Sequence, residues 1–120
     1  MLRKTYSMAS KYLYKKILKK LNLNKKELLL LKKKLKDGNI CAGPFVEGRK
    51  MCPNTTALSI KLKKKFKDNN VVSKNLKKLG VSKIYLWLFY ITFDIPSMLS
   101  KSFFGRKVDD LREAVGELLK

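Results

Sequence analysis

Apolar residues recur every three or four positions through most of this chain, the spacing that gives an α-helix one apolar face. The pattern holds over residues 5–21 and again over 24–37, with lysines filling the opposite side of each helix. Asn24 precedes Glu27 by three residues, which predicts a capping box at the start of the second helix. The short link between the two helices predicts an antiparallel helical hairpin.

The middle of the chain departs from this spacing. Residues 38–54 contain three glycines and two prolines, which favour a loop or a small β-hairpin over a helix. The following segment, 55–66, fits both a helical face and strand alternation, and its length and its Asn/Thr cap favour the helix. A shorter helix is predicted over 71–79, ending at Gly80.

Further helices are predicted in the last third of the chain. Ser82 is expected to cap an apolar helix over 83–93, and Asp94 is expected to open a short helix with Pro96 just inside it. A C-terminal amphipathic helix carries Val108, Leu111, Val115 and Leu118 on one face. Asp109 and Asp110 are placed near its start, where they would complement the helix dipole.

These elements define the expected architecture. The chain has 120 residues, enough for one domain with one modest core. We therefore expect a small all-α domain of five to six helices with one loop or β-hairpin excursion. Its parts are a basic helical hairpin (1–38), the excursion (39–53) and a helical core (54–120).

Charge is the unusual feature of the composition. Lysine and arginine number 29 against 9 acidic residues, for a net charge of +20. Small domains usually carry a net charge of about 2–8, and a larger excess repels itself unless an anionic partner relieves it. The net charge is +11 over residues 1–38, +7 over 53–80 and only +1 over 81–120. Nucleic acid, an acidic membrane surface or an acidic protein would each fit.

Nucleic acid is the favoured partner. Only four of the basic residues are arginine, and lysine is a point charge without the fork that reads guanine. We therefore expect a non-enzymatic DNA- or RNA-binding protein with weak sequence preference, compatible with a chromosome- or ribosome-associated role. The candidate contacts are Lys11, Lys15, Lys16, Lys19, Lys20, Lys32, Lys33, Lys34, Lys63, Lys64, Lys65, Lys77, Lys78 and, for base stacking, Tyr12.

The segment LGVS, residues 79–82, is typical of the turn in a DNA-reading helix-turn-helix. The helix after it offers Ile84, Trp87 and Leu88 where polar side chains would have to meet base edges. A helix that is apolar on nearly all sides belongs in a core or an interface. We predict that residues 84–93 fill the core or a homodimer seam, with Trp87, Phe89 and Phe93 among them.

Binding to an anionic membrane surface or to an acidic protein partner is the alternative function. The first helix, with lysines on one face and apolar residues on the other, would lie on an anionic membrane if its apolar stripe were free. No stretch is long enough to span a bilayer. A cytoplasmic location is expected. Organelle import is the alternative, because the N-terminus is basic, amphipathic and free of acidic residues up to Glu27.

Few residues suggest catalysis. The chain lacks histidine, so no enzyme activity, cofactor or metal site is expected. Cys41 and Cys52 are interpreted as reduced, semi-buried thiols, with a disulfide or a metal shared between two copies as alternatives. One possible anion pocket lies at a helix start. It would use Arg49, Lys50, Thr55 and Thr56.

Overall fold

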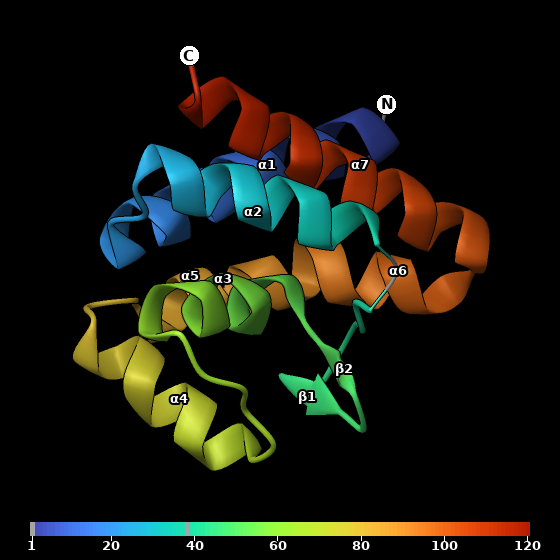
Figure 1. Ribbon diagram of the computed structural model, residues 1–120. Helices are drawn as coiled ribbons and strands as arrows, with labels where there is room; N and C mark the ends of the chain where they lie inside the picture. Colours follow the sequence, from blue (N-terminus) through green and yellow to red (C-terminus); the bar gives the residue numbers. More distant parts are fainter. Residues whose placement is uncertain (1, 38) are drawn as a thin grey trace.

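The computed structural model describes residues 2–37 and 39–120, with side chains from residue 8 onward (Figure 1). Helices dominate, and the only strands in these residues form a two-residue antiparallel ladder in which Val46 faces Met51. The predicted all-α class with one small hairpin is confirmed. The elements are α1 (Leu2–Leu21), α2 (Lys25–Lys36), β1 (Val46–Glu47), β2 (Lys50–Met51), α3 (Pro53–Leu62), α4 (Asn69–Lys78), α5 (Lys83–Phe89), the π-helical turn η1 (Tyr90–Asp94), α6 (Ile95–Leu99) and α7 (Lys101–Leu118).

The two predicted helices form as α1 and α2, but they do not pair with each other as an antiparallel hairpin, because each packs mainly against α7. The Asn24 side chain accepts a hydrogen bond from the Glu27 N–H at 2.8 Å, and the Asn24 N–H donates to Glu27 Oε1 at 2.9 Å. This reciprocal pair satisfies two backbone donors that would otherwise lack partners at the start of α2. The predicted capping box is confirmed.

The middle helix is shorter than predicted. It ends at Leu62 because Lys63 adopts a left-handed conformation with φ of 56°. The Ser59 hydroxyl then donates to the Lys64 carbonyl at 2.7 Å, and the Lys64 N–H donates to the Ser59 carbonyl at 3.2 Å. Lys63, Lys64 and Lys65 therefore lie on a loop, and the prediction that they continue the helix to Phe66 is wrong.

Residues 83–99 form one continuous helical stretch that includes the π-helical turn. The Ser82 side chain caps it, as predicted, by accepting from the Ile84 N–H at 3.1 Å. Asp94 does not start a new helix: its φ and ψ of −67° and −48° are helical, and its side chain makes no cap hydrogen bond. The predicted break at Asp94 is wrong because the backbone passes through it without unwinding.

The last helix begins earlier than its apolar stripe indicates. Ser100 caps α7 by accepting from the Phe103 N–H at 3.1 Å. Asp109 and Asp110 consequently lie in the middle of an 18-residue helix. The prediction that they complement the dipole at its start is wrong, because that effect is confined to the first turn.

The helices form two layers. Figure 1 shows α1, α2 and α7 above α3, α5 and α6, with α4 and the β1–β2 hairpin at the lower edge. The core between the layers is centred on Tyr14, whose hydroxyl donates to the Pro53 carbonyl at 2.8 Å. Its ring lies 5.7 Å from that of Phe89, which stacks on Phe93 at 5.0 Å. This aromatic stack joins α1, the helical stretch 83–99 and the start of α3.

The apolar helix predicted over 83–93 is only half buried. Phe89 and Phe93 fill the core as predicted, with exposed fractions of 1% and 0%. Trp87 and Ile84 point outward, with exposed fractions of 62% and 67%. The core interpretation is therefore wrong for Trp87, and the homodimer seam stays a prediction.

Candidate nucleic-acid interface

Three chain segments converge at one end of the molecule, on the left in Figure 1. They are residues 19–27, 59–65 and 75–83, which contain the ends of α1, α3 and α4 and the starts of α2 and α5. The Lys61 ammonium donates to the Asn22 carbonyl at 2.9 Å, which joins the first two segments. The Lys20 side chain lies 3.9 Å from the position that a Cβ on Gly80 would take, which places the third segment beside them. We call these three segments the basic end.

The basic end is almost purely cationic. Its segments contain eleven lysines and one acidic residue, Glu27, so they hold half of the net charge of +20 in 25 of the 120 residues. The Glu27 carboxylate is already committed to the capping box. All of these lysines except the partly covered Lys61 are exposed. They are Lys19, Lys20, Lys25, Lys26, Lys61, Lys63, Lys64, Lys65, Lys77, Lys78 and Lys83.

Helix stability does not explain all of these lysines. Those in the last turns of α1, α3 and α4 suit the partial negative charge at a helix C-terminus. Lys25 and Lys26 lie in the first turn of α2, and Lys83 is the first residue of α5. A cation at a helix N-terminus opposes the dipole and slightly destabilises the helix. The stability of these helices therefore does not account for Lys25, Lys26 and Lys83.

The loop after α3 presents its lysines in a fixed conformation. The Lys63 turn and the Ser59 hydrogen bonds hold the backbone, while buried Phe66 anchors the far side of the loop. The Lys64 ammonium lies 5.1 Å from the centre of the Phe66 ring, within range of a cation–π interaction. Lys63, Lys64 and Lys65 are therefore exposed from an ordered backbone.

Seven of the predicted contact residues lie at the basic end, but two others form internal ion pairs. The Lys11 ammonium lies 2.8 Å from Glu113 Oε1 and 3.6 Å from Glu117 Oε1, and Lys15 pairs with Glu117. The hydrogen bond that Lys11 donates to Glu113 raises the pKa of Lys11, and the one that Lys15 donates to Glu117 lowers the pKa of Glu117. These ion pairs join α1 to α7 and leave Lys11 and Lys15 less available to an anion, and their contact with phosphate stays a prediction.

The other predicted contacts lie outside the basic end. The C-terminal half of α2 carries Lys32, Lys33 and Lys34, and the Lys32 carbonyl accepts a hydrogen bond from Arg112 Nε at 3.3 Å. Tyr12 is 57% exposed on α1, with the Lys16 ammonium 5.4 Å from its ring centre. Tyr12 has the accessibility that stacking requires, but it lies outside the basic end.

Sequence reasoning missed four lysines of the basic end: Lys25, Lys26, Lys61 and Lys83. Three of them had a recognisable signal, because each lies one or two residues after a predicted N-cap, where a cation is unfavourable. Lys61 had no such signal. Its role depends on Asn22, which is 39 residues away in the chain.

The predicted anion pocket does not form. Thr55 and Thr56 are buried, and their polar groups are already hydrogen-bonded. The Thr55 N–H donates to Cys52 Sγ at 3.4 Å, while the Thr56 hydroxyl and N–H both donate to the Cys52 carbonyl at 2.9 Å. Cys52 thus caps α3 and uses the donors that an anion would need. Arg49 and Lys50 are exposed on the hairpin nearby.

Cys41 and Cys52 are both free thiols, and both are buried more deeply than predicted. Burial raises the pKa of Cys41 to about 11 and that of Cys52 to about 12. Both therefore remain protonated at neutral pH, and a thiol is a much weaker nucleophile than a thiolate. Among the described residues, no three His, Cys, Asp or Glu side chains form a group that could hold a metal ion.

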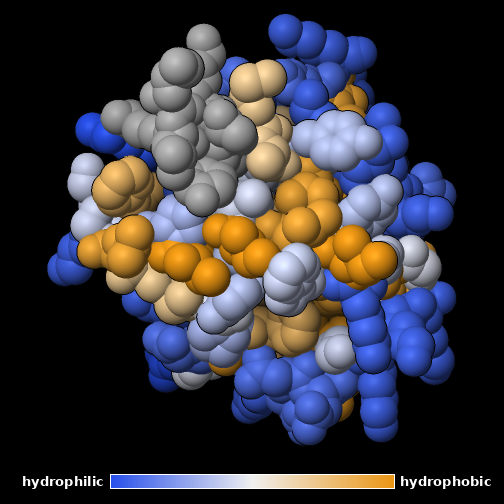
Figure 2. Space-filling model, turned by 180° about the vertical axis from the view of Figure 1, so that it is seen from behind, coloured by the Kyte–Doolittle hydropathy of each residue, from blue (hydrophilic) through white to orange (hydrophobic). Residues whose placement is uncertain are grey.

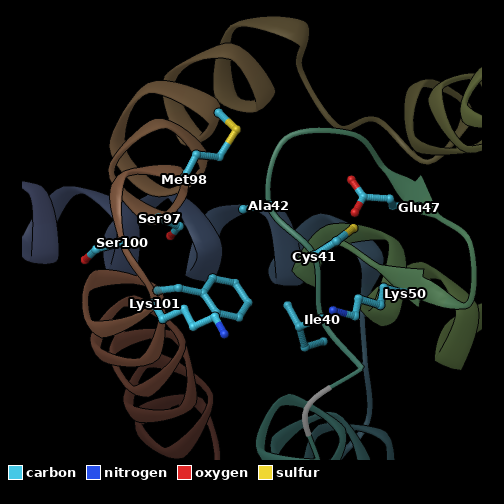
Figure 3. Close-up of a pocket in the computed structure, with 10 residues that line it drawn as sticks. Ile40, Cys41, Ala42, Glu47, Lys50, Ser97, Met98, Ser100 and Lys101 are labelled. Carbon is cyan, nitrogen blue, oxygen red and sulfur yellow. The ribbon is translucent and has the colours of Figure 1, made fainter.

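A cavity of about 390 Å³ lies between the hairpin and the α6–α7 junction (Figure 3). Cys41, Glu47 and Lys50 line it from the hairpin side, and Ser97 and Lys101 line it from the helices. Figure 3 shows Glu47 and Lys101 on opposite sides of this space. The lining mixes apolar, cationic and anionic groups, so it has no single ligand chemistry.

The described helices all fall short of the length and hydropathy that crossing a bilayer requires. No family model matches the chain, and no curated protein or solved structure is significantly similar to it.

Proposed function

We propose that this protein binds DNA or RNA through its basic end, by contacts between lysine side chains and phosphates. The observation that carries the proposal is the convergence of eleven lysines and a single, already bonded acidic residue from three separate segments. Such a concentration of one charge repels itself and attracts a polyanion. Neutralising phosphates releases their condensed counterions, which supplies the free energy of binding.

The same cluster argues for weak sequence preference. The three segments of the basic end contain no arginine, asparagine-rich stretch or helix with polar side chains positioned to read base edges. The helix that would enter a groove after the LGVS turn shows Ile84 and Trp87 to solvent. Phosphate contacts position a protein on nucleic acid without reading its sequence.

The basic end also favours phosphate contact over base stacking. Its segments contain no aromatic residue, whereas proteins that bind single strands usually place aromatic rings among the basic residues. Tyr12, the predicted stacking residue, lies on α1 outside this end. We therefore expect duplex to bind at least as tightly as a single strand of the same length.

A salt titration tests the proposal. Nuclease-treated protein would be added to fluorescent random-sequence duplexes and to matched single strands, with anisotropy read between about 50 and 200 mM salt. If six lysines contact duplex phosphates, log K falls against log salt with a slope of about −5. The absence of binding to either strand form at low salt would reject the proposal.

A further inference from the structure

A continuous row of apolar side chains is exposed on the face of the molecule where α5, η1 and α6 lie. Figure 2 shows hydrophobic surface extending across this face, with hydrophilic side chains below it and at its upper right. Leu99 is 73% exposed, and Ile84 and Trp87 exceed 60%. We call this row the apolar ridge. Its members are Ile84, Trp87, Tyr90, Ile95, Met98, Leu99 and Phe103.

The ridge belongs to a firmly held helix. The inner side of the stretch 83–99 buries Phe89 and Phe93 in the aromatic core, and its outer side carries the ridge. Six of the ridge residues, from Ile84 to Leu99, lie on the solvent-exposed side of this stretch, over about 22 Å at about 1.5 Å per residue. Phe103 extends the ridge onto α7. Met98, toward one end of the ridge, also lines the cavity of about 390 Å³ beside the β-hairpin.

The charges around the ridge are predominantly positive, although exposed Glu47 lines the same pocket as Met98, together with Lys50 and Lys101. Between Lys83 and Arg106 the only acidic residue is Asp94, and that residue is buried with an exposed fraction of 6%. Lys83, Lys101 and Arg106 are exposed at the two ends of this segment. A complementary partner must therefore be apolar at its centre and negatively charged around it.

An anionic lipid bilayer meets both requirements. A second copy would bring two predominantly cationic borders together, whereas an anionic bilayer presents negatively charged headgroups to them. Apolar side chains on an interfacial helix insert about 5–10 Å into the headgroup and acyl boundary, where Trp and Tyr are also favoured. We propose that the apolar ridge docks this protein on an anionic bilayer, with α5 and α6 lying in the plane of the interface.

This mode differs from the membrane binding that the sequence suggested. The apolar stripe of α1, including Leu13, Ile17 and Leu21, is buried in the core and is not presented to a surface. The ridge also uses different residues from the basic end, with Lys83 the one residue close to both. The two proposals can therefore fail independently.

Trp87 provides the probe for a direct test, because it is the only tryptophan in the chain. Nuclease-treated protein would be mixed with vesicles of phosphatidylcholine alone or with vesicles in which about 30% of the lipid is phosphatidylserine. The phosphatidylserine gives the second set a strong negative surface potential. We expect a blue shift of Trp87 emission, and quenching by brominated acyl chains, with the acidic vesicles only.

Two paired variants locate the contact. Ile84→Ser with Leu99→Ser removes apolar area from the ridge and should weaken partition into acidic vesicles by at least about tenfold. Leu29→Ser with Leu30→Ser makes the same type of change on α2, where these leucines are also exposed, and should leave partition unchanged. Circular dichroism checks that both variants keep the wild-type helix content.

Three results would overturn the docking proposal. The first is absence of partition into either vesicle. The second is sedimentation with acidic vesicles without a change in Trp87 emission, which would show adsorption by lysines alone. The third is a dimer in light scattering that the Ile84 and Leu99 variant abolishes, which would make the ridge a contact between two copies. None of these results bears on oligonucleotide binding.

Discussion

The lysines of α1 have different surroundings in two parts of the helix. Lys11 and Lys15, in the middle of the helix, reach α7 and pair with Glu113 and Glu117. Lys19, one turn further along, is exposed and belongs to the basic end. The comparison teaches that a lysine-rich helix face is not one functional surface, because the neighbouring helix decides which charges are neutralised and which remain available.

The interior shows what a charge costs when the fold encloses it. Lys107 is buried and its ammonium donates to Ser10 Oγ at 3.2 Å, and burial lowers its pKa. Burial also raises the pKa of Asp94 to about 7, against a hydrogen bond from the Gly43 backbone that lowers it. At the basic end the lysines keep their water, so their cost is mutual repulsion, which an anionic ligand removes.

The largest expected effect is on nucleic-acid affinity. Lys63→Gln, Lys64→Gln and Lys65→Gln together should reduce the log–log salt slope by about 2.7 and weaken duplex binding by about 10²-fold near 0.1 M salt. The physical reason is the loss of three exposed charges from an ordered loop. Fluorescence anisotropy across a salt series measures both quantities.

A matched triple variant controls for net charge. Lys33→Gln, Lys36→Gln and Lys50→Gln removes three exposed lysines outside the basic end. It should change the salt slope by less than about 1, because these residues lie away from the proposed phosphate contacts. Equal losses in the two triple variants would show that binding depends on total charge and would break the distinction between the regions.

The next effect concerns the interior carboxyl of Asp94. Its pKa is about 7 in the folded protein against an ordinary value of 3.8, so the folded state binds the proton more tightly. Below pH 3.8 the difference costs nothing, and stability then falls as pH rises until it levels off above about 7. The full difference is on the order of 4 kcal/mol.

Asp94→Asn should remove that dependence. The amide oxygen can still accept from the Gly43 N–H, while the buried negative charge is gone. Urea unfolding at pH 5 and pH 8 should show a smaller loss of stability on raising the pH for the variant than for the wild type. An unchanged difference between the two pH values would mean that another group carries the pH dependence.

A smaller effect is expected at the seam between α1 and α7. Lys11→Gln removes the pair with Glu113 and should lower the free energy of unfolding by about 0.5 kcal/mol, because partly exposed pairs are weak. Repeating the measurement in about 1 M salt should shrink the difference, since salt screens such pairs. Its duplex affinity should match that of the wild type, and a large loss would place Lys11 among the phosphate contacts.

The smallest effect has the opposite sign. Lys25→Gln with Lys26→Gln removes two cations from the first turn of α2 and should raise the free energy of unfolding by about 0.3 kcal/mol or more at low salt. The same variant should bind duplex more weakly. Thermal unfolding and anisotropy on one preparation would check both signs, and a variant that loses stability would refute the dipole argument.

Local structure could be predicted wherever one residue type has one strong preference. The stripes of α1 and α2, the Asn24 cap and the Ser82 cap all follow from spacing and cap chemistry. The end of α3 could not be predicted, because a lysine in the left-handed conformation has no sequence signal. The extent of α7 was underestimated for a related reason, since its first turns carry exposed residues outside the apolar stripe.

The site was predicted less completely than the fold. Periodicity shows which side of a helix is polar, but it does not show that α7 brings Glu113 and Glu117 beside Lys11 and Lys15. It also does not show that three helix ends meet, which is what concentrates the charge. Trp87 was placed in the core because an aromatic run resembles a buried helix, and only tertiary packing reveals which of its sides is covered.

The aromatic stack of Tyr14, Phe89 and Phe93 has a geometric consequence for the two proposed surfaces. It ties the helix that bears Trp87 to α1, whose last turn carries Lys19, and through the Tyr14 hydroxyl to the start of α3. The basic end and the apolar ridge therefore belong to one packed unit and keep a fixed orientation relative to each other. A polyanion bound at the basic end would therefore lie at a set angle to a lipid bilayer bound at the apolar ridge.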